Sequence, residues 1–407
     1  ERGFDWCKST GFNSMVTMQS WMFLSSYESM RVKLLKSKTI FGMTHMGNGV
    51  MGIAFGTAAT VFYNGGLGMY EGSFSYCDND AISNAGVPKQ FPVINDRLKT
   101  AKPDDFRKIP GSPVSYWVGK STLQVFEKAK KLGEISTSSN GVQTGDNGKY
   151  VRYWYEINFS LIGRKWFGYN KGGAFRRWYG NIAYVVDWEH SGARIKNEPN
   201  SCARGEEFYL KEGLTWSDVT SGMISCRYLP SGNIFDAAGP SAFFTSKTDL
   251  LSSIGLMNTK FVLELSKILN PTIHFQGGDY RKLPISSPIF EAQVVAITEE
   301  AIALSKQDWS RYEESPEFLS NSILTSAKEH PTLAFAFQFW SQITQADVVR
   351  LQFLEQENNR LFVSAYCLQN EFSSEVPESQ ITLARADREK DSQRLISYAI
   401  GCMMGRY

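Results

Sequence analysis

The 407-residue sequence has few of the residue types from which metal centres and disulfide frameworks are built. Its six cysteines are widely scattered and form no CxxC pair, and its four histidines form neither an HxH nor an HxxxH spacing. Both absences argue against a zinc site and against a disulfide-stapled domain. We therefore expect no metal site, and we interpret the cysteines as reduced, structural residues.

Long apolar runs are also missing. No stretch reaches about eighteen uninterrupted apolar residues, and the first residues lack the basic-then-apolar pattern of a signal peptide. We therefore expect a cytoplasmic protein with no membrane partner. The chain lacks an initiator methionine and starts with ERGFDWCKST, which is typical of the last turns of a helix, so we interpret it as the later part of a longer protein.

Complete catalytic patterns are absent as well. The acidic pairs Asp104-Asp105, Glu206-Glu207 and Glu299-Glu300 are typical of solvated charges and not of a metal-dependent nuclease. No G-x-S-x-G elbow occurs, and no S-x-x-K stands in a credible setting. We expect no catalytic residue in this chain, so that any chemistry needs residues that precede Glu1.

The first sixty-odd residues have the order of a closing section of a doubly wound sheet. A strand is predicted over 13–18, followed by a helix that starts with Ser25 and Glu28 in the spacing of a capping box. Further strands are predicted over 39–45 and 57–64, on either side of a glycine-rich tip. This order is that of the methyltransferase variant of the fold, in which the final strand inserts antiparallel beside its neighbour.

The remaining chain divides by its composition. Residues 65–107 show no sustained period and are interpreted as a long connection. Residues 108–290 alternate short strand-like runs with turns, and helical patterns dominate from 291 to 407. The predicted fold class is therefore α/β and α+β: the end of a Rossmann-like methyltransferase sheet over 1–64, a mixed domain, and a helical C-terminal region.

What the chain does contain is a surplus of aromatic residues, 14% of the total, next to cations. The stretch LIGRKWFGYNKGGAFRRWYGN, residues 161–181, holds five basic residues, six aromatic residues and no acid. Cations neutralise phosphates, and aromatic faces stack on unpaired bases or support arginine. A nucleic-acid surface and a twisted structural hairpin both remain open. The candidate DNA contacts are Arg164, Lys165, Trp166, Lys171, Arg176, Arg177, Trp178 and Tyr179.

Upstream, GVQTGDNGKYVRYWYEI at 141–157 joins a glycine-rich turn to a basic and aromatic run. Such a turn can cradle an anion, although it lacks the spacing of a phosphate-binding loop, and a hairpin turn is the competing interpretation. Thr144, Asn147 and Lys149 are the candidate DNA contacts here.

Motifs along nearly the whole chain resemble one family. They are ERGFDW, SMVTMQSWMFLSSYE, HMGNGV with GTAATVF, KIPGSPVSYWV, QTGDNGKYVRYWYE, KWFGYNKGGAFRRWYGN, GLTWSD and ISYAIGCMMGRY. Together they resemble the PglX-type adenine-specific DNA methyltransferases of BREX phage-defence systems, which are related to bifunctional restriction-modification enzymes. The resemblance implies S-adenosylmethionine as cofactor and double-stranded DNA as partner.

In that family a glycine-rich turn binds the cofactor and an Asn-Pro-Pro-Tyr motif holds the target adenine, and neither is in this sequence. We therefore expect the chain to be inactive alone, with its cofactor-binding residues unknown. The resemblance also implies that residues 108–290 are a target recognition domain, which reads the sequence around an adenine that is flipped out of the duplex.

The resemblance further points to residues near the flipped base. The tip at 46–55 matches a hairpin that carries an aromatic ring in relatives, and the matching position here is Met51, with Phe55 close by. Gln19, Ser20 and Trp21 follow a strand at its carboxyl end, where α/β sheets bind ligands, although an ordinary buried loop is an equal alternative.

Three functions remain open. The first is a site-specific DNA adenine methyltransferase to which this chain supplies target recognition. The second is a nuclease-methylase fusion with the cleavage residues upstream, and the third is a DNA-binding and assembly module whose helical end docks other phage-defence proteins.

Overall fold

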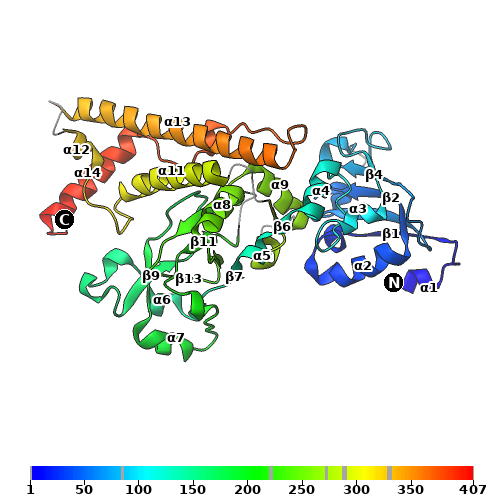
Figure 1. Ribbon diagram of the computed structural model, residues 1–407, viewed down its shortest axis with the longest axis horizontal. Helices are drawn as coiled ribbons and strands as arrows, with labels where there is room; N and C mark the ends of the chain where they lie inside the picture. Colours follow the sequence, from blue (N-terminus) through cyan, green and yellow to red (C-terminus); the bar gives the residue numbers. More distant parts are fainter. Residues whose placement is uncertain are drawn as a thin grey trace. The chain divides into compact units, whose positions relative to one another are not determined.

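The computed structural model describes residues 2–83, 87–219, 223–270, 274–286, 291–327 and 332–406, without the side chains at positions 51, 291, 326 and 327 (Figure 1). The chain divides into two units, each described by itself. The first comprises Glu1–Ala129 with Leu265–Thr272, and the second comprises Lys130–Glu264 with Ile273–Tyr407. The observed division after residue 129 thus differs from the boundary expected near residue 107.

The first unit contains a five-stranded sheet with the order β1-β3-β2-β4-β5. β3 (Thr57–Tyr63) pairs antiparallel with both β1 (Phe12–Met18) and β2 (Thr39–Met46), so that it lies between two strands that precede it in the chain. This is the insertion predicted for the end of a methyltransferase-type sheet. The predicted fold class is confirmed in this part of the chain.

The loop between β1 and β2 is fixed by a buried arginine. Arg31 in α2 (Glu28–Ser37) is 1% exposed, and its guanidinium donates to the carbonyl oxygens of Trp21, Leu24 and Gly111 at 2.7–3.1 Å. The predicted capping box is not formed. Ser25 lies instead in a 3₁₀ turn ahead of α2, which has no side-chain cap.

Two strands lie in the segment that was expected to have little regular structure. β4 (Gly72–Cys77) adds parallel to β2, and β5 (Lys99–Ala101) pairs antiparallel with β4. A side chain at Gly72 would meet the carbonyl oxygen of Ile40 at 2.3 Å, which explains glycine at this close approach. Elsewhere, the first unit also contains the helices α1 (Arg2–Asp5), α3 (Pro103–Arg107) and α4 (Lys120–Lys128).

The second unit holds two four-stranded sheets, β13-β9-β10-β8 and β12-β11-β14-β7, and a short pair, β15-β6. Their brevity agrees with the predicted alternation of short strands and turns. The strands are β6 (Lys130–Lys131), β7 (Thr137–Ser139), β8 (Val151–Tyr153), β9 (Trp166–Asn170), β10 (Tyr184–Asp187), β11 (Gly213–Trp216), β12 (Cys226–Leu229), β13 (Asn233–Phe235), β14 (Ser241–Phe243) and β15 (Pro284–Ile285).

Two consecutive helices, separated by a short break, follow the last strand of the second four-stranded sheet. α8 (Lys247–Met257) ends at Asn258, whose side chain bonds to both backbone groups of Cys226 at 3.0 Å, and α9 (Lys260–Leu269) starts after it. Asn258 therefore ties the helix end to β12. Short helices in the rest of this unit are α5 (Leu132–Ile135), α6 (Asn147–Tyr150), α7 (Ala193–Lys196) and α10 (Gly277–Tyr280).

The predicted helical C-terminal region is confirmed. α11 (Glu291–Ser310) packs against α8 and against α13 (Leu333–Ala365), the long helix at the top of the second unit in Figure 1. α12 (Ser322–Ala327) and α14 (Arg388–Met403) complete it. Within the described ranges, none of the helices combines the length and apolar character needed to cross a bilayer.

Candidate nucleic-acid interface

The basic and aromatic stretch at 161–181 divides into an exposed and an inward part. Arg164 is exposed, and among the described residues its guanidinium has no carboxylate partner. Lys165 lies 3.9 Å from the carboxylates of both Asp187 and Glu189, and Trp166 is half-buried in β9. The ammonium of Lys171 lies 5.7 Å from the ring of Tyr184. These four residues remain reachable from solvent.

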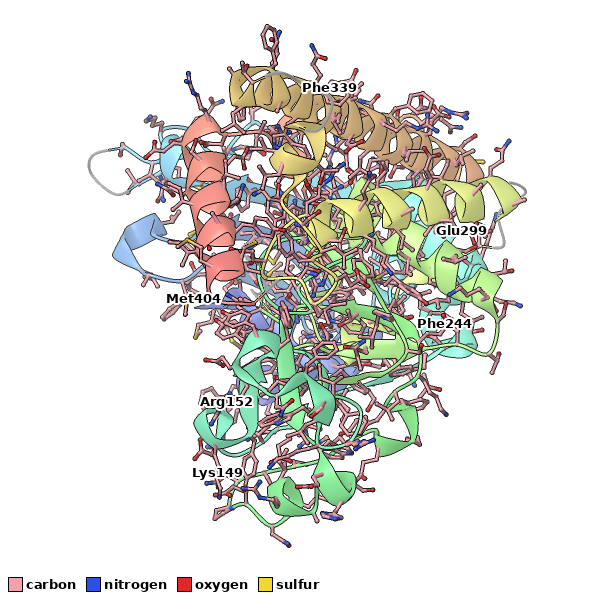
Figure 2. All side chains as sticks on the ribbon, turned by 90° about the vertical axis from the view of Figure 1, so that its left-hand side faces the viewer. Lys149, Arg152, Phe244, Glu299, Phe339 and Met404 are labelled. Atoms are coloured by element: carbon pink, nitrogen blue, oxygen red, sulfur yellow. The ribbon has the colours of Figure 1, made fainter. Side chains whose placement is uncertain are left out.

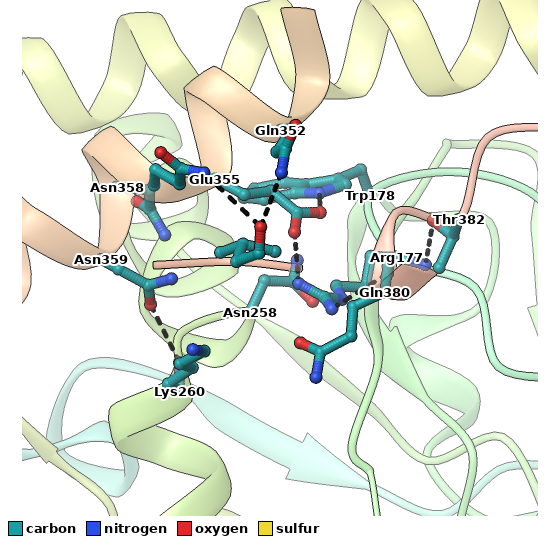
Figure 3. Close-up of polar contacts among 12 residues, drawn as sticks. Arg177, Trp178, Asn258, Lys260, Gln352, Glu355, Asn358, Asn359, Gln380 and Thr382 are labelled. Carbon is teal, nitrogen blue, oxygen red and sulfur yellow. Dashed lines mark hydrogen bonds and ion pairs between the residues drawn. The ribbon is translucent and has the colours of Figure 1, made fainter. Parts of the chain in front are cut away.

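The inward part is centred on Arg177, which forms a buried ion pair with Glu355 of α13 (Figure 3). Arg177 Nη1 lies 2.5 Å from Glu355 Oε2, and Trp178 Nε1 donates to Glu355 Oε1 at 2.8 Å. Trp178 is fully buried, and the Glu355 side chain is 1% exposed. Burial raises the pKa of Glu355 above its usual value, because desolvation outweighs Arg177 and the indole N–H.

The flanking residues are also held by carboxylates. Arg176 pairs with Asp308 at 2.7 Å and lies 5.1 Å from the ring of Trp309, while Tyr179 donates to Glu317 at 3.0 Å. Burial raises the pKa of Asp308 against the opposing effect of Arg176. The DNA-facing surface expected for Arg176, Arg177, Trp178 and Tyr179 is therefore not what the structure shows, and the structural-hairpin interpretation describes them. Phosphate contact there would break buried pairs.

The turn at 144–149 is held by a hydrogen bond within itself and by an ion pair to Glu198. Thr144 is buried and donates to the amide oxygen of Asn147 at 2.8 Å, while Asn147 itself is exposed. Lys149 Nζ lies 2.6 Å from the carboxylate of Glu198, which raises the pKa of Lys149 and lowers that of Glu198. Asn147 and Lys149 thus stay accessible, whereas Thr144 has a structural role. Lys149 is labelled beside Arg152 in Figure 2.

Three neighbouring tyrosines were not predicted as a unit: Tyr153 at the end of the edge strand β8, Tyr155 in the turn after it, and Tyr184 of β10. Tyr153 stacks on Tyr155, with ring centroids 5.2 Å apart and planes 4° apart, and on Tyr184 at 4.7 Å and 28°. Tyr153 and Tyr155 are 38% and 42% exposed. Lys171 lies over Tyr184, and the guanidinium of Arg406 lies 4.9 Å from the ring of Tyr155. We call Tyr153, Tyr155 and Tyr184 the tyrosine row.

The sequence signal for this row was the run KYVRYWY, which was noted as basic and aromatic. The third ring could not be assigned from sequence, because it depends on the antiparallel register that places Tyr184 of β10 opposite Tyr153 of β8. Cross-strand neighbours come within reach only when the register is known.

In the first unit, the residues expected near the target base lie at the carboxyl ends of β1 and β2. Gln19 Oε1 lies 2.6 Å from His45 Nε2, Ser20 is partly exposed, and Phe55 is 50% exposed. Trp21 is 8% exposed and packs in the core, so for this residue the buried-loop interpretation describes the structure. The side chain of Met51 lies outside the described residues.

His45 forms the centre of this edge. It is buried, and its Nδ1 lies 3.3 Å from the hydroxyl of Tyr116, opposite the contact of its Nε2 with Gln19. Burial, helped by the charge of Arg97, lowers the pKa of His45 to about 3, so the ring is neutral at physiological pH. A neutral ring satisfies both partners if Nε2–H donates to Gln19 and the Tyr116 hydroxyl donates to Nδ1.

A cavity of about 760 Å³ opens beside β1, with Phe4, Met15, Ser20, Trp21 and Met30 among the residues that line it. The lining is largely apolar. Across the part of the chain that the structure describes, no group of three or more histidine, cysteine, aspartate or glutamate side chains is arranged to hold a metal ion.

The two units therefore combine a methyltransferase-type sheet end with a mixed unit that presents cations and tyrosines. No protein-family model matches the chain. It is 34% identical over 431 aligned positions to the adenine-specific methyltransferase PglX of Lacticaseibacillus casei (strain Zhang), which covers 98% of this chain and 36% of that protein. It is 32% identical over 440 positions to the adenine-specific methyltransferase BrxX of Escherichia coli O9:H4 (strain HS), covering 100% and 35%.

The predicted resemblance is confirmed: along its whole length the chain is homologous to PglX-type adenine-specific methyltransferases. It spans only about a third of the length of these relatives. Among solved structures, the chain is similar to the type IIL restriction-modification enzyme MmeI in complex with DNA, with a TM-score of 0.46 and 13% identity over 96% of this chain and 50% of that one. It is also similar to a nuclease-deletion mutant of the type ISP enzyme LlaGI, with a TM-score of 0.43 and 9% identity over 74% and 36%.

Proposed function

We propose that this chain is part of a site-specific DNA adenine methyltransferase of a phage-defence or restriction-modification system, which uses S-adenosylmethionine. In this proposal the first unit ends the catalytic sheet and the second unit supplies target recognition. The observation that carries the proposal is the whole-length similarity, at 34% and 32% identity, to two adenine-specific methyltransferases.

Within the second unit, we assign DNA contact to the side chains that solvent can reach. Arg164 and Lys171 are the strongest candidates, because the described residues offer neither of them a carboxylate partner. Lys165 and Lys149 would have to exchange a carboxylate for a phosphate, which makes their net contribution smaller. Trp166, Asn147 and the tyrosine row then add polar and apolar contact beside these cations.

Within the first unit, we assign the vicinity of the flipped adenine to the edge formed by Gln19, Ser20, Met51 and Phe55. The half-exposed ring of Phe55 can offer a face to an extruded base, which such enzymes hold by stacking and hydrogen bonds. Gln19 is fixed by His45, so its amide has a defined orientation at the carboxyl ends of the strands.

The test is to map N6-methyladenine in DNA from cells that express the complete methyltransferase of which we propose this chain to be a part. The proposal predicts modified adenines in one recurring sequence context. A variant with Arg164→Ala and Lys171→Ala is expected to lose most of this methylation while accumulating normally. Arg360→Ala is a matched control, because Arg360 is an exposed arginine of α13 that already pairs with Glu357. Unmodified adenine in cells with the intact protein would overturn the proposal.

A further inference from the structure

Arg97 of the first unit is held between two aromatic rings. Its guanidinium carbon lies 4.3 Å from the ring centroid of Tyr76 and 4.2 Å from that of Trp117. Tyr76 is in β4, and Trp117 lies in the segment that precedes α4. Stacking on both faces fixes the plane of a guanidinium and leaves its N–H groups to point outward from its edge.

The N–H groups of this guanidinium are not used by the protein. In the described ranges, no carboxylate lies within ion-pair distance of Arg97, and its side chain donates no hydrogen bond to another described residue. Its nitrogens are not among the buried unsatisfied atoms, so solvent reaches them. Two other arginines of the unit differ: Arg31 donates to three carbonyl groups, and Arg107 pairs with Asp104.

Arg97 lies in a turn ahead of β5, and its position relative to the sheet is also specific. The ring of Trp117 stacks on His45 at 6.1 Å and 26°, and His45 in turn contacts Gln19. The ring of Tyr76 lies 5.2 Å from that of His45. The rings of Tyr76 and Trp117 thus lie between Arg97 and His45, at the carboxyl ends of the parallel strands β2 and β4. This is the edge where α/β sheets bind ligands.

We propose that Arg97 binds a phosphate of the DNA backbone next to the target nucleotide, through two parallel N–H···O hydrogen bonds. A guanidinium fork matches the geometry of a phosphate, and the two rings keep the fork oriented before DNA arrives. The inference rests on the proposed function and extends it, because it adds a backbone contact from the catalytic unit to those of the recognition unit. Tyr76 and Trp117 are positioning residues for this cation.

The experiment is a salt titration of duplex DNA binding by the 407-residue chain and its variants. Removing one phosphate contact makes the slope of log K against log salt less negative by about 0.9 for duplex DNA. Arg97→Ala is expected to show that change. Tyr76→Leu retains the charge and is expected to weaken binding with the slope unchanged, since only the orientation of the fork is lost.

The matched control is Lys102→Ala, which also removes one cation from the first unit, but one that lies 3.5 Å from the carboxylate of Glu71. Its slope is expected to equal that of the parent. Equal melting temperatures of the parent and Arg97→Ala check that the fold is retained. If Arg97→Ala binds with the affinity and slope of the parent, the inference is wrong while the proposed function stands. If the parent chain binds no duplex, both are overturned.

Discussion

Glu355 and Arg177 form a buried ion pair between residues 178 positions apart in the chain, with 2.5 Å between Oε2 and Nη1. The second carboxylate oxygen accepts from the indole of Trp178. One side chain of α13 thus satisfies two consecutive residues of the stretch that looked most like a DNA-binding surface. The pair joins the helical region to the mixed part of the same unit.

Glu355→Ala is expected to destabilise the second unit by about 3–5 kcal/mol, because it leaves a buried guanidinium uncompensated and an indole N–H without an acceptor. Urea unfolding followed by tryptophan fluorescence measures the shift in midpoint. The double variant Glu355→Leu with Arg177→Met removes both charges and is expected to cost less than the two single changes together. Strict additivity of the two changes would show that the residues are not coupled.

Truncation after residue 290 is expected to prevent the second unit from folding. The deletion removes Glu355, Asp308 and Glu317, which are the partners of Arg177, Arg176 and Tyr179. Limited proteolysis of the truncated chain should therefore cleave throughout 130–290, whereas the full chain should yield a protected core. A truncated chain that resists proteolysis and keeps its DNA affinity would contradict this account, and would favour the helical region as a separate docking module for other proteins.

The stability of the first unit is expected to fall as the pH drops from 7 to 5. The pKa of His45 is lowered from 6.5 to about 3, so at pH 5 the unfolded chain binds a proton that the native chain does not. Linkage then predicts a loss of about 2 kcal/mol over this range. This loss of stability is measured by hydrogen exchange of the β2 amides at both pH values. His45→Gln should flatten this dependence, and an unchanged pH dependence in that variant would show that another group causes it.

The isolated chain is expected neither to bind S-adenosylmethionine tightly nor to methylate DNA, because the glycine-rich turn and the Asn-Pro-Pro-Tyr motif of the family are absent from its sequence. Titration calorimetry at micromolar cofactor should give no binding heat. A clear micromolar isotherm would place the cofactor site within these residues and would contradict our assignment.

Local patterns were sufficient to predict several elements. The strands at 13–18, 39–45 and 57–64 were found within a residue or so of their predicted ends, because alternation and glycine turns are encoded locally. β4 was missed, since GSFSYC lies in a segment rich in glycine, asparagine and serine, and only pairing with β2 makes it a strand.

The candidate site was harder to predict for a related reason. Whether a cation faces DNA or a carboxylate depends on partners that are distant in sequence. Arg176, Arg177 and Tyr179 find theirs 132, 178 and 138 positions downstream. Arg164, only twelve positions before Arg176, has none among the described residues and stays exposed. Arg164 and Arg176 lie in the same basic and aromatic stretch, so the composition of that stretch could not show which of the two contacts a carboxylate.

The central claim, that the second unit presents a DNA-binding surface at Arg164 and Lys171, is tested most directly by measuring duplex affinity of the 407-residue chain over a range of salt concentrations. We predict that Arg164→Ala and Lys171→Ala each make the slope of log K against log salt less negative by about 0.9 and weaken binding to every duplex. Arg360→Ala, which removes an ion-paired arginine, should leave the slope unchanged. If the parent chain binds duplex DNA and both variants bind it with the parent's affinity and slope at every salt concentration, the surface lies elsewhere and the claim is wrong.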